Sequence, residues 1–248
     1  MIISVERILA VAGRSLSQIR EDRRFLGFSI IFPLVIIYFI NVVLDVLVGP
    51  FFDPTVYVIP YGAFIIHFIT FILTAIVVVR ERTAGTLPRM FISGYNQVDV
   101  ILGYLISYSI LASVQSLLVL LELNWLFELS YSFEKLAALY LVFWLLSAIS
   151  LEIGIFVSNF ARNEGQVIPF IPLVLISMII SGVILPVEKL PEWVQLFAYV
   201  SPLFYANEII QHLIAGGVLG DVLDILGQLV LFGLVVMTLA TLTLQERD

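Results

Sequence analysis

Six long apolar stretches constrain the fold of this chain more than any other feature of its sequence. A helix needs roughly 20 mainly apolar residues to cross the bilayer hydrocarbon, which is about 30 Å thick. The stretches that meet or nearly meet this length are residues 25–48, 56–79, 100–121, 136–157, 167–185 and 222–244. Because a backbone in lipid has to satisfy its own hydrogen bonds, we expect an all-α membrane protein with six transmembrane helices.

Composition supports the same class of protein. Of the 248 residues, 61% are hydrophobic and 12% are charged, whereas a soluble domain has about 45–50% apolar and about 25% charged residues. This excludes a soluble enzyme, a disordered chain and a nucleic-acid binder, so no nucleic-acid partner is expected. The chain has no Cys, which excludes a disulfide framework, a Cys-ligated zinc site and a thiol nucleophile. We expect a single transmembrane domain over residues 1–248.

Basic residues sort to one side of the predicted spans and give the orientation. With the N-terminus in the cytoplasm, ten of the twelve basic residues fall in cytoplasmic segments and only Lys135 and Lys189 fall outside. The cytoplasmic ten are Arg7, Arg14, Arg20, Arg23, Arg24, Arg80, Arg82, Arg89, Arg162 and Arg247. Acidic residues, Asp53 and Glu188 among them, gather outside. The positive-inside rule therefore predicts a multi-pass protein of the cell membrane with both termini cytoplasmic.

Residues 4–20 are amphipathic. Apolar side chains from Val5 to Ile19 recur at helical spacing, while Arg7 and Arg14 lie on another face. Such a helix lies in the membrane interface with its arginines over anionic headgroups, so membrane lipids are expected partners.

The loop at residues 80–94 is short, cytoplasmic and mixed in charge. Thr83 or Thr86 is positioned to cap a short helix that Gly94 ends, with Pro88 in its first turn. This helix would carry Leu87, Met90 and Phe91 on one face. Apolar anchors at the membrane edge indicate a surface on which another protein docks.

A second unusual segment follows the fifth apolar stretch, at residues 186–212. It is largely apolar, but Ser201-Pro202 divides it into pieces too short to span. Apolar helices of that length are typical of re-entrant or interfacial segments at the outer leaflet. Trp193, Tyr199 and Tyr205 suit an interfacial position.

Three motifs together resemble the membrane subunit of type-2 ABC exporters, the ABC-2 permease family, including its drug-resistance type. The first is the basic helix that ends Arg20-Glu21-Asp22-Arg23-Arg24-Phe25, with Pro33 beyond it. The second, Arg80-Glu81-Arg82-Thr83-Ala84-Gly85-Thr86-Leu87-Pro88-Arg89, is similar to the family's segment between spans two and three. The third is Ser181-Gly182-x-x-x-Pro186-x-x-x-Leu190-Pro191-x-Trp193, followed by Ser201-Pro202-Leu203-x-Tyr205. The departures are Thr83, where the family often has an acid, and Met90, where it often has Leu.

The resemblance implies a function and its residues. Two permease copies would pair as a homodimer and dock on two copies of a cytoplasmic ABC ATPase subunit, which would hold ATP and Mg; this chain itself would carry no cofactor. The ATPase-coupling residues would be Arg80, Glu81, Arg82, Gly85, Thr86, Leu87, Arg89 and Met90. The outer gate would comprise Ser181, Gly182, Pro186, Pro191, Trp193, Pro202 and Tyr205. The expected cargo is amphipathic: a drug-like molecule, a lipid or a lipid-linked glycan.

The sequence carries no energy-converting or catalytic motif of its own. Neither lysine follows a Gly-x-x-x-x-Gly pattern, so no P-loop is present. His67 and Glu152 are ionisable residues inside predicted spans and are candidate polar groups of a transport pathway; Glu152 could instead pair with Arg162. Two other functions remain open: a stand-alone secondary transporter or channel, and an intramembrane enzyme that uses Ser181 and His67.

Overall fold

The computed structural model describes residues 4–47 and 55–244, and these residues form helices and turns without a strand. Asp53 and Arg247, used above for orientation, lie outside the described residues. The α-helices are α1 (Val5–Glu21), α2 (Arg23–Leu47), α3 (Thr55–Thr83), α4 (Thr86–Ile92), α5 (Gln97–Leu126), α6 (Phe133–Ser158), α7 (Ile171–Ile180), α8 (Glu192–Ala198), α9 (Pro202–Ile214) and α10 (Leu223–Thr243). Short 3₁₀ helices are η1 (Glu164–Phe170), η2 (Val187–Lys189) and η3 (Leu219–Val222).

Five helices in the described part of the chain are long and apolar enough to cross a membrane, namely α2, α3, α5, α6 and α10. They confirm five of the six predicted spans. The sixth predicted stretch, residues 167–185, stays a prediction as a crossing: η1 and α7 together cover Glu164–Ile180, which is shorter than the five helices above. Pro169 lies inside η1 and Pro172 in the first turn of α7. Each proline removes one backbone N–H donor from the start of this segment, which is of 3₁₀ form over Glu164–Phe170.

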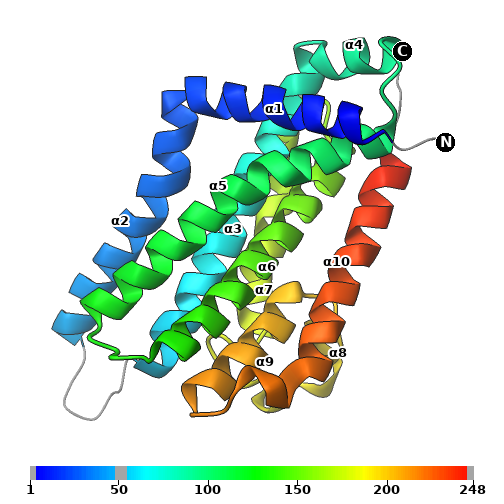
Figure 1. The fold of residues 1–248 in the computed structure, drawn as a ribbon. Helices are drawn as coiled ribbons and strands as arrows, with labels where there is room; N and C mark the ends of the chain where they lie inside the picture. Colours follow the sequence, from blue (N-terminus) through cyan, green and yellow to red (C-terminus); the bar gives the residue numbers. More distant parts are fainter. Residues whose placement is uncertain (1–3, 48–54, 245–248) are drawn as a thin grey trace.

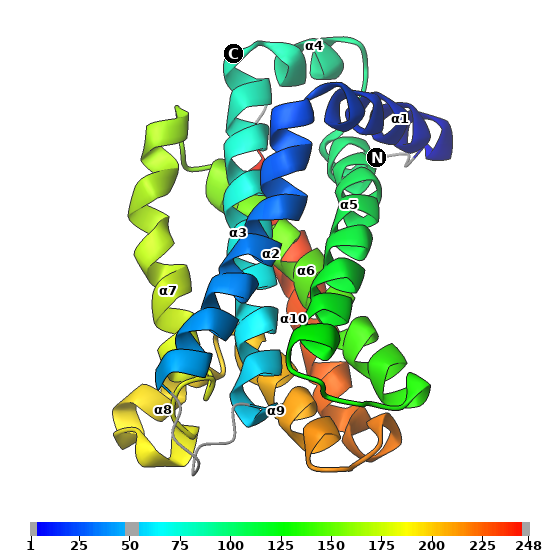
Figure 2. The same cartoon turned by 90° about the vertical axis from the view of Figure 1, so that its left-hand side faces the viewer.

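The long helices form a bundle with distinct ends (Figures 1 and 2). We call the end that carries α1 and α4 the α4 end, and the opposite end, with α8 and α9, the α9 end. η1 and α7 lead from the end of α6 near α4 to α8 at the α9 end (Figure 2). The 80–94 segment, which contains α4, and the 186–212 segment, which contains α8 and α9, therefore lie at opposite ends of the bundle.

Glycines lie at two close helix crossings. A Cβ added at Gly154 of α6 would lie 2.8 Å from the carbonyl oxygen of Phe71 in α3. A Cβ at Gly103 of α5 would lie 2.5 Å from Cβ of Val11 in α1. Glycine at these positions lets the backbones approach, as is common where helices pack in membranes. The core behind these crossings is aliphatic and aromatic, with Phe71 and Phe143 fully buried.

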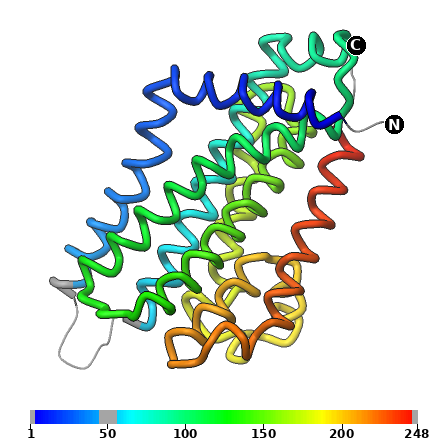
Figure 3. The backbone as a smooth tube through the Cα atoms, in the orientation of Figure 1, coloured from blue at the N-terminus to red at the C-terminus, as the bar shows by residue number. Residues whose placement is uncertain are grey.

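The predicted amphipathic segment corresponds to α1, which lies across the α4 end on α5. Ser4 caps this helix by accepting a hydrogen bond from the backbone N–H of Arg7. The buried face of α1 comprises Ile8, Val11, Ala12, Ser15 and Ile19. At Asp22 the chain turns sharply into α2, as the backbone tube shows (Figure 3).

Candidate functional site

The last turn of α3 carries three consecutive charged residues that contact three different parts of the molecule. Glu81 is buried at 2% exposure. One of its carboxylate oxygens accepts a 2.6 Å hydrogen bond from Arg14 of α1, and the hydroxyl of Tyr104 in α5 donates to the same oxygen. The ion pair with Arg14 joins α3 to α1, and the hydrogen bond from Tyr104 joins α3 to α5.

Arg82 binds the end of α6. Its guanidinium donates to the carbonyl oxygens of Ser158 at 2.7 Å and Ala161 at 3.1 Å, and to the side-chain oxygen of Asn159 at 3.1 Å. The last carbonyl groups of a helix have no hydrogen-bond donor within that helix, and Arg82 supplies donors to carbonyl groups at the end of α6. Asn159 in turn donates to the carbonyl oxygen of Ala240 in α10 at 3.0 Å.

Arg80 faces outward and makes the third connection. Its guanidinium lies 3.1 Å from the carboxylate of Glu164, the first residue of η1. It also lies 3.8 Å from the carboxylate of Asp22, at the α1–α2 turn. We call Arg80, Glu81 and Arg82 with these partners the α3 junction. Arg80, Glu81 and Arg82, predicted as ATPase-coupling residues, thus each contact another segment of the same chain.

The turn from α3 to α4 differs from the prediction in its cap. Gly85, with φ +72°, occupies the cap position before α4, so the predicted cap at Thr83 or Thr86 is wrong. The Thr83 hydroxyl donates back to the carbonyl of Arg80 at 3.0 Å, and Thr86 is the first helical residue. Glycine takes a left-handed conformation without the steric cost of a Cβ, which allows this tight turn.

Two of the predicted docking anchors in α4 are not available on the surface. Leu87 is 1% exposed and Met90 is 9% exposed, because both pack into the chain's own core. The role of Leu87 and Met90 in coupling to a partner stays a prediction. The two side chains hold α4 against the bundle.

The outward side of α4 presents other residues. Arg89 is exposed, and Ile92 is 87% exposed. A cavity of about 370 Å³ opens between α4 and the α6–η1 loop, with Phe91 on one wall and Phe160 and Arg162 on the other. We call Arg89, Ile92 and this cavity the α4 surface; it combines apolar and basic groups.

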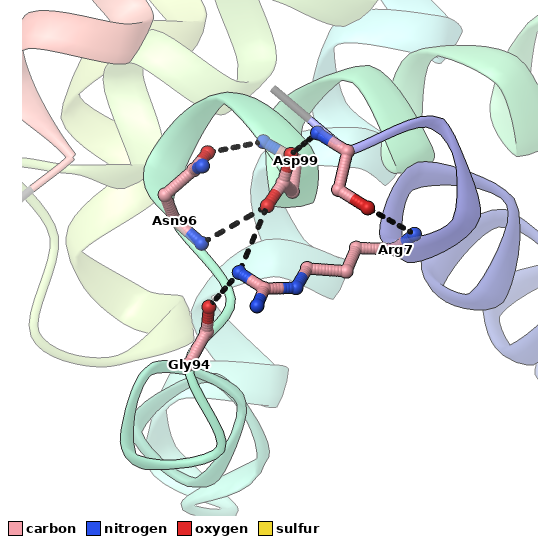
Figure 4. A network of polar contacts seen from close by, with 5 residues as sticks. Arg7, Gly94, Asn96 and Asp99 are labelled. Carbon is pink, nitrogen blue, oxygen red and sulfur yellow. Dashed lines mark hydrogen bonds and ion pairs between the residues drawn. The ribbon is translucent and has the colours of Figure 1, made fainter. Parts of the chain in front are cut away.

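The exit from α4 is fixed by a carboxylate that sequence reasoning missed. Asp99 is fully buried and forms a capping box with Asn96 at the start of α5 (Figure 4). It also accepts a hydrogen bond from the backbone N–H of Ser4 at 3.2 Å and lies 4.0 Å from Arg7. Arg7 donates to the carbonyl of Gly94. The spacing Asn96-x-x-Asp99 is a capping signal that could have identified this residue.

At the α9 end, a buried polar cluster joins α7 to α9. The Ser181 hydroxyl lies 2.8 Å from that of Ser201, and the Ser181 carbonyl accepts a 3.0 Å hydrogen bond from the Asn207 amide. Gly182 has φ +79°, and a Cβ there would lie 3.1 Å from the Asn207 nitrogen. The structure thus brings Ser181 and Gly182 together with Asn207, which the sequence did not single out.

The other outer residues occupy helix starts and the surface. Pro186 precedes η2, Pro191 precedes α8 and Pro202 opens α9. Trp193 is 67% exposed. The Tyr205 hydroxyl donates to the carbonyl of Tyr199 at 3.0 Å. These prolines divide the 186–212 segment into short helices, because proline is favoured in the first turn.

The two polar residues inside the bundle have different surroundings. His67 is buried, and its Nδ1 lies 2.6 Å from the Ser150 hydroxyl, which donates to the Leu146 carbonyl at 2.6 Å. Since a hydroxyl has one hydrogen, Nδ1 is the donor, and His67 does not activate Ser150 as a base would. Ser181 bonds to Ser201 instead, which removes the basis for a Ser181–His67 enzyme. In the described residues, Oε2 of Glu152 has no hydrogen-bond partner and no ion pair joins Glu152 to Arg162.

The chain is similar in sequence to known membrane transport proteins. Residues 6–215 match the family described as "ABC-2 type transporter". The chain is 26% identical over 143 residues to the probable multidrug ABC transporter permease YbhR of Escherichia coli (strain K12), covering 57% of this chain and 39% of that protein. It is 24% identical over 157 residues to the linearmycin resistance permease protein LnrN of Bacillus subtilis (strain 168), covering 62% of this chain and 40% of that protein. The match thus spans about two fifths of the length of these relatives.

Proposed function

This chain belongs to the ABC-2 type transporter family as a multi-pass permease, and we propose on that premise that it is the transmembrane subunit of an ATP-driven exporter. In this proposal two copies pair, and each docks on a separate cytoplasmic ATPase subunit that binds ATP and Mg. The chain supplies the path across the cell membrane and does not hydrolyse ATP. The α4 end faces the cytoplasm.

The observation that carries the proposal is the α3 junction. α4 follows α3 after a two-residue turn, so a force on α4 reaches α3 directly. From there Glu81 transmits it to α1, Arg82 to α6 and Arg80 to η1. A loop that only connected two spans would need none of these contacts. ATP-driven closure of two ATPases would use them to switch the helices between inward-open and outward-open states.

The α4 surface is the docking site in this proposal. Ile92 is the apolar anchor, and the exposed Arg89 and Arg162 set the register through charge. Gly85, Thr86, Leu87 and Met90 keep α4 in position from within the chain.

The remaining segments fill the other roles of an exporter. We propose that η1 and α7 form a sixth crossing and that the 186–212 segment is a re-entrant outer gate, held by Ser181, Gly182 and Asn207. Glu152 keeps an unpartnered carboxylate oxygen, and its role in the pathway stays a prediction. The cargo is an amphipathic drug-like molecule, lipid or lipid-linked glycan. Support comes from the mainly aliphatic spans and from two relatives whose names specify multidrug transport and linearmycin resistance.

The test is to look for a gene encoding a P-loop ATPase beside this one and to measure complex formation between that ATPase and this chain. Ile92→Asp combined with Arg89→Glu should weaken binding by at least about tenfold, the effect of losing roughly 1.4 kcal/mol of interface energy. The melting temperature of the permease alone should not change. Val218→Asp is the matched control, because Val218 is 61% exposed at the α9 end. An unchanged complex would refute the docking site, and cargo transport without any ATPase would favour a stand-alone secondary transporter.

A further inference from the structure

A second cavity at the α4 end is unrelated to the α4 surface. It has a volume of about 410 Å³ and is lined by residues of α1, α2 and α5; Figure 1 shows how these three helices meet. Its walls include Gly13, Leu16 and Arg20 of α1, Leu26 of α2, and Ile110 and Val114 of α5. Ligand sites in proteins have volumes of about 300–1,000 Å³.

The walls of this groove are apolar and open. Leu16, Ile110 and Val114 are 40%, 48% and 44% exposed. Gly13 is exposed, and a Cβ added there would meet no atom within 4 Å. The apolar wall continues along one face of α5 through Leu117 and Leu121, both exposed. A groove that opens into an apolar strip along a spanning helix fits a long hydrocarbon chain.

The mouth of the groove is basic. Arg20 lines it, and Arg23 and Arg24 follow at the start of α2, all three exposed. Within the described ranges, no ion pair involves any of these arginines. The Asp22 carboxylate between them accepts from the backbone N–H of Phe25 and faces Arg80. Basic clusters at this level of a membrane attract anionic headgroups by about 1 kcal/mol per residue.

We propose that this groove binds one anionic phospholipid of the leaflet at the α4 end, with its phosphate at Arg20 and an acyl chain between α1, α2 and α5. That this leaflet is the cytoplasmic one rests on the orientation given in the proposed function. The presence of the lipid site does not depend on that orientation. The bound lipid fills the corner between α1 and α2 and so fixes the angle at which α1 meets the bundle. Since Arg14 of α1 holds Glu81, the lipid acts on the α3 junction.

The test uses the full-length chain in detergent, without an ATPase, and measures melting temperature on addition of phosphatidylglycerol or phosphatidylcholine. A ligand that binds only the folded state stabilises it, so phosphatidylglycerol should raise the melting temperature by about 5 °C and phosphatidylcholine should have little effect. Gly13→Leu fills the groove and should abolish the shift. Gly27→Leu is its control, because a Cβ at Gly27 also meets no atom within 4 Å and Gly27 does not line the groove.

Two further variants separate charge from shape. Arg20→Gln should reduce the phosphatidylglycerol shift by at least half, whereas Lys189→Gln, the same change at the α9 end, should leave it intact. Val114→Phe fills the groove from α5 and repeats the Gly13→Leu result should that variant fold poorly. Equal shifts with both lipids, or a full shift in both filled variants, would overturn the proposal. Loss of a dimer in size-exclusion chromatography of Gly13→Leu would also overturn it, in favour of a second copy of this chain as the occupant.

Discussion

At the residue scale, the arginines at the α4 end do more than set orientation. The positive-inside rule explains where Arg80 and Arg82 lie, but not why each meets a particular acceptor. Their contacts join residues about 80 positions apart in sequence. No local pattern encodes such pairs, and the sequence therefore predicted the location of these charges but not their partners.

A charge-conserving change distinguishes the two roles of Arg82. Arg82→Lys keeps the positive charge but loses the planar fork that reaches three acceptors on Ser158, Asn159 and Ala161. We expect it to lower the free energy of unfolding by about 1–3 kcal/mol, measured from the melting temperature in detergent. Arg89→Lys, at an exposed position, is the control and should have no effect. Equal stability of both variants would reduce Arg82 to a topological signal.

The Arg14–Glu81 pair should show strong coupling in a double-mutant cycle. Glu81→Gln leaves Arg14, whose side chain is 35% exposed, without its ion pair, and we expect a loss of about 1–3 kcal/mol, less than for a fully buried pair. Arg14→Gln should cost at least as much, because it leaves the buried Glu81 carboxylate without its counter-ion. The double variant should lose less than the sum of the two, because neither charge is left alone. Additive losses in thermal unfolding would contradict a direct pair.

At the element scale, the long helices could be predicted from the sequence, but the way the helices pack could not. Long apolar stretches predicted α2, α3, α5, α6 and α10, because length and hydropathy are local properties. The burial of Leu87 and Met90 escaped prediction, since it depends on where α1 and α5 lie. An apolar face on a short helix does not by itself say whether it meets its own chain or a partner.

The α3–α6 crossing should depend on Gly154. A methyl group there would come within 2.8 Å of the Phe71 carbonyl oxygen, a backbone atom that cannot rotate away. Gly154→Ala should therefore destabilise the protein by about 1–3 kcal/mol. Gly227→Ala in α10 is the control, because its Cβ meets nothing within 4 Å; it should be neutral or slightly stabilising. Unfolding measured in parallel would refute tight packing if the two variants behaved alike.

At the scale of the whole molecule, the number of crossings decides which surfaces share a side of the membrane. Five helices of the described chain have spanning length, while η1 and α7 together are shorter. Ser93 and Lys189 are exposed and separated by α5, α6, η1 and α7. They lie on opposite sides of the membrane if η1 and α7 cross it, and on the same side if they do not.

Single cysteines can test this directly, because the native chain has none. A membrane-impermeant maleimide added to intact cells should label Lys189→Cys but not Ser93→Cys. Ser93→Cys should react only after the membrane is opened. Labelling of both variants in intact cells would leave five crossings and place the 186–212 segment on the same side as α4.

The three charged residues of the α3 junction also determine where the molecule can bend. Successive residues of a helix point about 100° apart, so Arg80, Glu81 and Arg82 restrain the end of α3 from three directions. A hinge needs at least one free direction of rotation, and this joint has lost all three. Bending has to occur away from these contacts, as in the part of η1 beyond Glu164, where Pro169 interrupts regular backbone hydrogen bonding. We therefore expect the α3 junction to move as one rigid unit while the interrupted helix bends.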